Sequence, residues 1–313
     1  MSEIILLILA GLVLLLVSGK FLVDSSVSIS SLFRIPSMIV GLTVVAMGTS
    51  APELLVSIKA AVSAHPEIAM GNVVGSNISN ILLILALTAI IFPVKIPALS
   101  VRRDWPVMMG VTLLVYLFSR NMALSRFEGL MLLILLLLYI FFSINQAGKG
   151  KGDQATENSG NSPGMKWWLA LPVFAVSCAG LALGADLLVE NAATLARHFG
   201  VSERAVAVSM VAVGTSLPEL VTSLIAAFKK ETDIALGNII GSNIMNILAV
   251  LGIAGIIRPM TVSLNMVHFD MLWMIGSAVL LFLFMIPARN GKITRLEGII
   301  MLSAYLCYLY LVF

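Results

Sequence analysis

Two glutamates, Glu53 and Glu219, lie in the middle of long apolar stretches of the chain. A carboxylate at such a depth in a membrane span costs several kcal/mol and by default marks a functional site. Each glutamate directly follows a proline, which removes one helical hydrogen bond and clashes with a carbonyl one turn earlier. We therefore expect a helix break beside each carboxylate. The carbonyls that it frees are expected near Ala46, Met47 and Gly48 in the first half and near Ala212, Val213 and Gly214 in the second.

Hydroxyl groups surround both predicted breaks. Thr49 and Ser50 precede Glu53, and Thr215 and Ser216 precede Glu219. Hydroxyl, carbonyl and carboxylate oxygens form the hard ligand set that Ca²⁺ and Na⁺ prefer, and soft ligands are absent from these segments. The two breaks are thus predicted to hold a cation.

Two further apolar segments carry polar pairs. Ser76 with Asn80, and Ser242 with Asn246, are spaced i, i+4 and therefore share one helix face. The glycines of both segments form GxxxG pairs, which allow close helix approach; they are Gly71, Gly75, Gly237 and Gly241. We expect this packing to bring the Ser and Asn faces close to the glutamates.

The charge of the two glutamates suggests what the site does. Two ionised carboxylates carry −2, which one Ca²⁺ or two Na⁺ would neutralise, so both ions would compete for a single cavity. Competition for one cavity is what ion exchange requires, provided that only the loaded cavity changes sides. A structural alternative is that each glutamate merely bonds a neighbouring helix, but two copies beside two breaks favour the functional interpretation.

The chain contains an internal repeat, in which the second copy follows the first at an offset of 166 residues. GTSAPELLVS at 48–57 returns as GTSLPELVTS at 214–223, and GNVVGSNISNILLIL at 71–85 returns as GNIIGSNIMNILAVL at 237–251. Each half is predicted to contain five spans, and an odd number places the two halves in the membrane in opposite directions. Inverted repeats with interrupted helices are typical of alternating-access transporters.

The composition requires a membrane protein. The 313 residues are 59% hydrophobic, and their mean hydropathy is +1.05. Only 11% are charged, far below the roughly 25% of charged residues in soluble domains. We predict an all-α protein with ten transmembrane helices. Their predicted ranges are 3–23, 36–62, 69–92, 104–119, 125–146, 166–190, 204–228, 234–257, 264–287 and 294–313.

The spans divide into a first half at 1–146, a polar linker at 147–165 and an inverted second half at 166–313. With both termini outside, twelve basic residues face the cytoplasm and six face outward, which agrees with the positive-inside rule. The inner residues are Arg34, Lys95, Arg102, Arg103, Lys149, Lys151, Lys166, Lys229, Lys230, Arg289, Lys292 and Arg295. The linker is then cytoplasmic, and the membrane is expected to be a plasma (inner) membrane.

Other classes of function find little support. A net charge of +3 is too small and dispersed for a nucleic-acid partner, and Cys178 and Cys307 show no disulfide or zinc pattern. No cofactor is expected, and the chain is expected to work as a monomer. Lys20, Asp24, Asp186 and Glu190 lie near span ends, where we expect them to pair with one another or to reach the headgroups.

At the repeated motifs the chain resembles the sodium/calcium exchangers of the calcium/cation antiporter superfamily, whose alpha-repeat signatures are GTS-x-PE and G-S-N-x-x-N. The resemblance covers essentially the whole chain. It implies exchange of Ca²⁺ for Na⁺, with Glu53 and Glu219 as principal ligands and a mobile pair of first and sixth helices. The further ligands that it implies are Thr49, Ser50, Ser76, Asn80, Thr215, Ser216, Ser242, Asn246 and the carbonyls of Ala46 and Ala212.

One departure from relatives is informative. Relatives that co-transport K⁺ have an aspartate where this chain has Asn246, so the resemblance points to a K⁺-independent exchanger. The resemblance to the family also implies electrogenic Ca²⁺ extrusion.

Three rival functions stay open. An H⁺/Ca²⁺ exchanger could share the fold, although the proton-coupled branch has acids where this chain has Ser-Asn. An intramembrane hydrolase would need a base near Ser50 or Ser216, and no His or Lys is predicted at that depth. A channel could use the same carboxylates but could not drive Ca²⁺ uphill.

Overall fold

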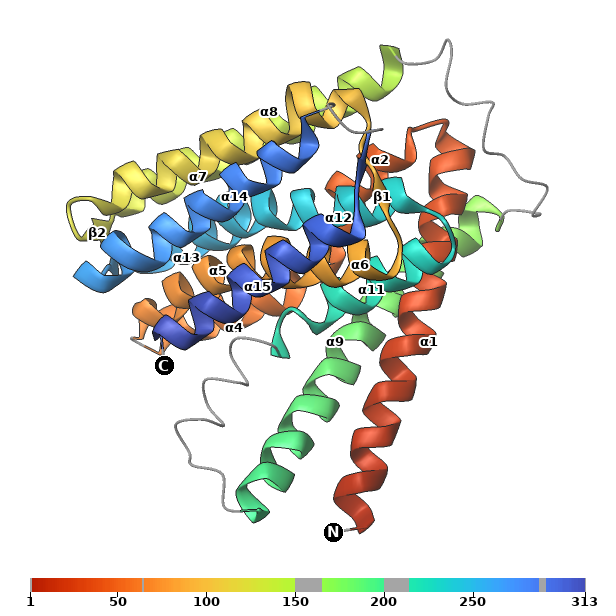
Figure 1. Ribbon diagram of the computed structural model, residues 1–313, viewed down its shortest axis with the longest axis horizontal. Coiled ribbons are helices and arrows are strands. Elements are labelled where there is room, and N and C mark those ends of the chain that lie inside the picture. Colours follow the sequence, from red (N-terminus) through yellow and green to blue (C-terminus); the bar gives the residue numbers. More distant parts are fainter. Residues whose placement is uncertain (1, 64, 150–164, 200–213, 287–290, 313) are drawn as a thin grey trace.

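The computed structural model describes residues 2–63, 65–149, 165–199, 214–286 and 291–312, and most of them are helical (Figure 1). In the first half, with η denoting a π-helical segment, the elements are α1 (Ser2–Phe33), α2 (Ser37–Val40), η1 (Gly41–Val45), α3 (Ala46–Thr49), α4 (Ala51–Val62), α5 (Pro66–Ser79), η2 (Asn80–Leu85), α6 (Ala86–Ile91), β1 (Val94–Lys95), η3 (Ser100–Asp104), α7 (Trp105–Ser119), β2 (Ala123–Leu124) and α8 (Arg126–Lys149). In the second they are α9 (Trp167–His198), α11 (Leu217–Phe228), α12 (Thr232–Met245), η5 (Asn246–Leu251), α13 (Gly252–Ile257), β3 (Met260–Thr261), η6 (Met266–Asp270), α14 (Met271–Met285), β4 (Lys292–Ile293) and α15 (Arg295–Val312).

The helices confirm an all-α membrane protein but not the predicted count of ten spans. Within the described residues, seven helices are long and apolar enough to cross a membrane, or eight if Ser37–Thr49 and Ala51–Val62 form one bent span. The predicted span at 104–119 falls short because α7 has 15 residues and follows the charged segment Ser100–Asp104. Of the predicted span at 204–228, residues 204–213 lie outside the described part.

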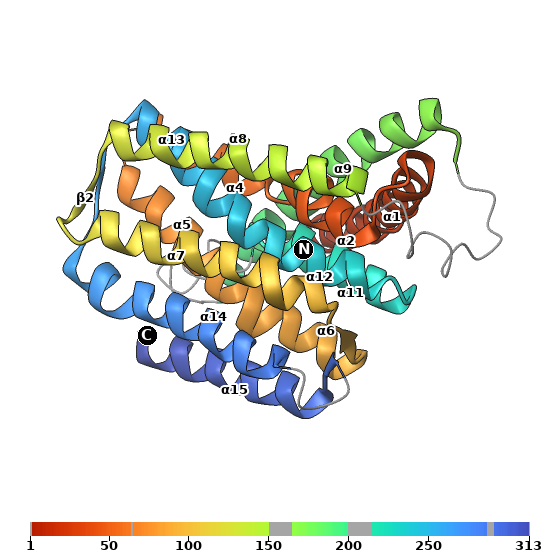
Figure 2. The same ribbon diagram turned by 90° about the horizontal axis from the view of Figure 1, so that it is seen from above.

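Two continuous helical segments form the centre of the bundle. In an 18-residue apolar window of each segment, 72% of the residues are buried in Glu67–Ile91 and 83% in Thr232–Ile257, against 22% in Arg126–Asn145 and 28% in Arg295–Val312. Figure 2 shows α8 and α15 on opposite flanks, with α5 and α12 between them. The segments that carry the repeated GSN motifs are therefore shielded from the surroundings by the other helices.

Structural features repeat between the halves at nearly the sequence offset. The π-helical segments η2 and η5 begin at Asn80 and Asn246, and η3 and η6 begin at Ser100 and Met266. Helix α8 begins at a capping box in which Ser125 and Glu128 bond each other's backbone amides, and Thr294 and Glu297 do the same at α15.

The small strands pair across the halves rather than within them. Strand β1 pairs with β4, aligning Val94 with Ile293, and β2 pairs with β3, aligning Ala123 with Thr261. The repeat offset relates β1 to β3, so exchanging the halves turns one ladder into the other. Figure 1 places β1 and β2 at opposite ends of the bundle.

Helices α1 and α9 form a pair that is steeply inclined to the other long helices (Figure 1). Glycines allow their backbones to touch: a Cβ atom added to Gly11 would lie 2.8 Å from the Leu188 amide nitrogen, and one added to Gly184 would lie 3.0 Å from that of Leu15. A small apolar cluster, which includes Leu22, Val45 and Ala226, joins this pair to η1, α11 and neighbouring helices, separately from the main core.

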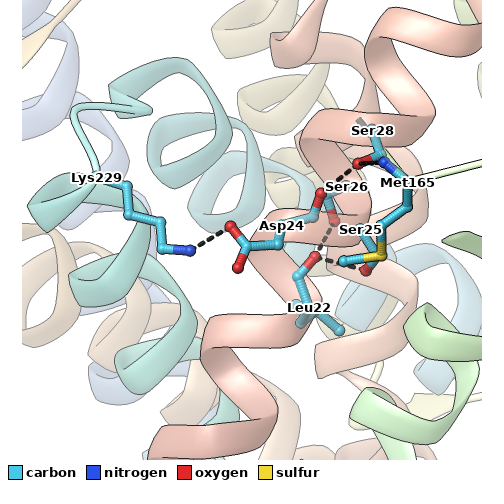
Figure 3. A network of polar contacts seen from close by, with 7 residues as sticks. All are labelled: Leu22, Asp24, Ser25, Ser26, Ser28, Met165 and Lys229. Carbon is cyan, nitrogen blue, oxygen red and sulfur yellow. Dashed lines mark hydrogen bonds and ion pairs between the residues drawn. The ribbon is translucent and has the colours of Figure 1, made fainter. Parts of the chain in front are cut away.

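Helix α1 ends ten residues beyond the predicted range of 3–23 because its serines bond within the helix. Ser25 and Ser26 both donate to the Leu22 carbonyl, and Ser28 donates to that of Asp24 (Figure 3). A hydroxyl bonded to its own helix needs no water, so the polar run SSVSISS remains helical.

The expectation that charged residues near the span ends of α1 and α9 pair with one another is wrong for Asp24. Its carboxylate accepts a hydrogen bond from Lys229, which follows α11 (Figure 3). Lys20, Asp186 and Glu190 are exposed. Near Lys229, burial and the charge of Asp233 raise the pKa of Glu231. Thus α1 is tied to the turn between α11 and α12.

Candidate cation site

In both repeated motifs the serine three residues before the glutamate has a non-helical backbone, and a helix begins directly after it. The first segment bends by 44° between Ser37–Thr49 and Ala51–Val62. Ser50 has backbone angles φ −81° and ψ 7°, and Ser216 has φ −87° and ψ 3°, outside the α-helical region in both halves. Pro52 and Pro218 then occupy the first turns of α4 and α11, where a proline needs no amide partner.

The two glutamates lie in the first turns that follow these breaks, and neither is accessible to solvent. The amide groups of a helix N-terminus favour a negative charge in the first turn. The local sequence therefore creates both the break and a place for a buried carboxylate beside it.

Contacts between the halves surround the Glu219 carboxylate. Its Oε1 atom accepts hydrogen bonds from Ser50 at 3.0 Å and from Ser242 at 3.5 Å. Thr49 Oγ1 lies 3.4 Å from Ser242 Oγ, so the hydroxyls of the first break meet those of α12. The structure thus brings Thr49, Ser50, Glu219 and Ser242 together as predicted.

Several buried oxygen atoms in this region have no hydrogen-bond partner. They are both carboxylate oxygens of Glu53, Oε2 of Glu219, Oγ of Ser216 and the side-chain oxygens of Asn80 and Asn246. Among the described residues, no Lys, Arg or His forms an ion pair with either glutamate. Buried carboxylates without a counter-charge are costly, and a bound cation would remove that cost.

The chemistry of these atoms fits a hard cation. Apart from the Asn80 amide nitrogen, the unpartnered side-chain atoms of these residues are oxygens. The described part of the chain holds no cluster of three or more His, Cys, Asp or Glu side chains that would favour a transition metal. Ca²⁺ takes six to eight oxygen ligands in flexible geometry, which carboxylates, hydroxyls and amide oxygens together supply.

The last asparagine of each G-S-N-x-x-N motif marks a feature that the sequence did not predict. Asn80 and Asn246 are the first residues of η2 and η5, where the helix widens for one turn. Single-turn π segments occur frequently at functional sites. Asn246 also donates to Asn77 Oδ1, and Asn77 donates to the Asn243 carbonyl, so these side chains link α5 to α12.

The backbone carbonyl of Ala46 is not freed by the break. It accepts the Ser50 amide at 3.0 Å and lies 3.4 Å from Thr49 Oγ1, because the helix ends only after Thr49. Pro52 has no amide proton for the Gly48 carbonyl, so the expectation of a freed carbonyl holds for Gly48 and is wrong for Ala46. The equivalent Ala212 lies outside the described residues. Ser76 donates to the carbonyl of Asn72 in its own helix.

The predicted close packing is present at the second glycine pair. Helix α12 contacts α2 and η1 so closely that a Cβ atom on Gly237 would lie 2.6 Å from the Met38 carbonyl oxygen. One on Gly241 would lie 2.5 Å from that of Leu42. The segment that the offset places opposite Gly71 and Gly75 lies outside the described residues, so the first pair is not tested.

Four further polar residues adjoin the site and were not predicted. Asn72 and Asn238 bond the threonines Thr215 and Thr49, and Ser57 and Ser223 bond the asparagines. All four are conserved between the two halves at the offset of 166, and that identity was the available signal.

Comparisons with known proteins show which proteins this chain resembles. The family model described as sodium/calcium exchanger protein matches residues 3–145 and 169–313. The chain is 41% identical to the CaxA protein of Alkalimonas amylolytica, covering 98% of this chain and 97% of the relative. It is 31% identical to the sodium/calcium exchanger MaX1 of Methanosarcina acetivorans, covering 98% of each.

A solved structure of the sodium-calcium exchanger NCX_Mj, soaked with zero Na⁺ and Ca²⁺, superposes with a TM-score of 0.85. It is 30% identical to this chain, and the match covers 100% of both. The fold described above is therefore shared over its full length.

Proposed function

Since this chain belongs to the sodium/calcium exchanger family, we propose that it is a secondary antiporter that exchanges Ca²⁺ for Na⁺ by alternating access. Cation/Ca²⁺ antiport is the activity of the family. Sodium as the coupling ion, independence from K⁺ and net charge movement are the further steps of the proposal.

The observation that carries the proposal is the pair of buried carboxylates without a cationic partner. Glu53 and Glu219 are fully buried, and three of their four carboxylate oxygens lack a hydrogen bond. One Ca²⁺ or two Na⁺ would neutralise them. We assign as ligands Glu53, Glu219, Thr49, Ser50, Ser76, Asn80, Thr215, Ser216, Ser242, Asn246 and the carbonyls of Ala46 and Ala212. The Ala46 oxygen has two lone pairs, so it can bind an ion while it accepts the Ser50 amide.

The proposed architecture is two inverted halves of five spans each, at 1–146 and 166–313, joined by a cytoplasmic linker. The paired π segments and the exchange of strands between halves support it. Basic residues support the orientation with both termini outside: the β1–β4 ladder aligns Lys95 with Lys292, which are both expected at the cytoplasmic side.

Coupling to Na⁺ is tested by radiolabelled Ca²⁺ uptake into proteoliposomes. We expect an outward Na⁺ gradient to drive uptake, and a pH gradient or no gradient to give none. Uptake should be the same with and without K⁺, because positions 80 and 246 are both asparagine. Uptake driven by the pH gradient alone would instead establish an H⁺/Ca²⁺ exchanger, the alternative function of this fold.

Electrogenic exchange gives a separate prediction. If more than two Na⁺ move per Ca²⁺, at least one net charge crosses per cycle, and each such charge is worth about 2.3 kcal/mol at 100 mV. Imposing an inside-positive potential on the vesicles with K⁺ and valinomycin should therefore slow Na⁺-driven Ca²⁺ export, which moves Na⁺ inward, and reversing the potential should accelerate it. An export rate that is the same at both potentials would show electroneutral exchange.

A further inference from the structure

We propose that Asn72 and Asn238 are positioning residues that take the hydroxyl protons of Thr215 and Thr49, so that each threonine turns only lone pairs toward the cation. This inference rests on the proposed function, because it concerns the same cation site. It assigns a role to two residues outside the ligand set.

The first arrangement centres on Asn72, which is 2% exposed. Its Nδ2 group donates to Ser57 Oγ at 3.1 Å and to the backbone carbonyl of Glu53 at 3.2 Å. Its Oδ1 atom accepts the hydroxyl of Thr215 at 3.2 Å. The amide thus lies between the carboxylate-bearing turn of α4 and a threonine of the other half.

The second arrangement repeats the first with the halves exchanged. Asn238 is fully buried, donates from Nδ2 to Ser223 Oγ at 3.1 Å, and accepts the hydroxyl of Thr49 at 2.9 Å. The offset of 166 relates all three residues to their counterparts. One isolated hydrogen bond could be incidental, whereas the same three-residue arrangement in both halves indicates a common requirement.

The direction of these bonds follows from the donor groups. An asparagine amide has one acceptor oxygen, and its NH₂ group can only donate. Because Ser57 and the Glu53 carbonyl engage the NH₂ group of Asn72, the amide oxygen must face Thr215. Threonine has a single hydroxyl proton, so once that proton points at the amide oxygen, only lone pairs remain for other partners.

A cation needs those lone pairs. Without the asparagine, the Thr49 proton can rotate toward other acceptors, such as the Ala46 carbonyl 3.4 Å away, or into the cation site itself. A hydroxyl hydrogen that points at the ion repels it. The asparagine therefore acts on ion affinity through the threonine and not by contact with the ion.

The test is a double-mutant cycle measured as the KM for Ca²⁺ in Na⁺-driven uptake. Asn238→Ala alone is expected to raise the KM about tenfold with little change in maximal rate, in line with a lost hydrogen bond to an ion-binding group. In a Thr49→Val background, which has no hydroxyl to orient, Asn238→Ala should add nothing. In a Thr49→Ser background, which keeps the hydroxyl, it should again cost about tenfold.

Controls separate this role from a general loss of packing. Asn191→Ala removes an asparagine that bonds the Leu187 carbonyl within α9, and it should leave the KM unchanged. If Asn238→Ala does not fold, Ser223→Ala is the substitute, because it leaves Asn238 in place and removes the next partner in the hydrogen-bond series from Ser223 through Asn238 to Thr49. It should cause a smaller rise in KM, and Thr49→Val should abolish that rise. The cycle of Asn72 with Thr215 should behave in the same way.

Two failures are distinguishable. Wild-type protein without Na⁺-driven Ca²⁺ uptake would overturn the proposed function. Wild-type uptake combined with additive effects of Asn238→Ala and Thr49→Val would overturn the positioning role alone, because additivity means that the two residues act independently.

Discussion

Replacement of Glu53 or Glu219 by glutamine is expected to abolish Na⁺-driven Ca²⁺ uptake while the protein still folds. Glutamine has nearly the same shape but removes one of the two negative charges that would balance the ion. Removing one partner of a buried charge pair costs about 3–5 kcal/mol, which corresponds to a loss of affinity of roughly a hundredfold to several thousandfold. Uptake and Ca²⁺ binding should both fall by this amount.

Thermal unfolding in detergent separates loss of the site from loss of the fold. In the absence of Ca²⁺, each variant should melt at or above the wild-type temperature, because a neutral amide replaces a buried carboxylate that has no counter-charge. Saturating Ca²⁺ stabilises a protein that binds it, by about 2.7 kcal/mol at a hundredfold excess over Kd, and only the wild type should show this increase.

Glu67→Gln is the matched control, since Glu67 is exposed and lies beside His65 at the start of α5. It should keep both uptake and the Ca²⁺-dependent rise in melting temperature. Wild-type flux in both Glu53→Gln and Glu219→Gln would remove the proposed site.

Substitution of Gly241 by alanine is expected to impair both stability and transport. The added Cβ atom would lie 2.5 Å from the Leu42 carbonyl oxygen and 2.7 Å from the Cβ atom of Ala46. These contacts are with backbone and a short side chain, so α12 must move away from η1 and α3. Overpacking of this kind costs about 1–3 kcal/mol.

The same movement displaces the neighbouring residue Ser242, which lies against Thr49 and Glu219. We expect Ca²⁺ uptake to fall about tenfold or more, with a lower melting temperature. Gly110→Ala is the control, because Gly110 is exposed on α7 and no described atom lies within 4 Å of an added Cβ. Equal effects of the two substitutions would show that close packing at Gly241 is not required.

Much of the site could be predicted because its residues are of types that are rare inside apolar membrane spans. A glutamate or proline inside an apolar span is conspicuous, and the repeat doubles the signal at Pro52 and Pro218. Of the four residues in the helix-face argument, Ser242 bonds a glutamate, Glu219. Sequence spacing alone was sufficient there, since only a helical period was needed.

Other features depend on contacts that spacing does not encode. The extension of α1 to Phe33 depends on serine hydroxyls that bond their own helix, whereas a polar run of that composition is also typical of a loop. The pairing of Asp24 with Lys229 requires knowing that α11 ends beside α1. The π segments that begin at Asn80 and Asn246 leave no mark in hydrophobic periodicity, because both segments are apolar after the asparagine and buried on nearly all sides, so no amphipathic pattern exists to be shifted.

The exchange of short strands between the halves also has a consequence for the order of biosynthesis. Val94 meets its partner Ile293 only after about 200 further residues have been synthesised, and such sequence-distant pairings form late. The first half therefore leaves the ribosome with the edge of β1 unpaired and with Asn72 lacking Thr215. A nascent chain that stops before β4 is therefore expected to expose this unpaired edge and to be recognised as incomplete by the quality control of the cell.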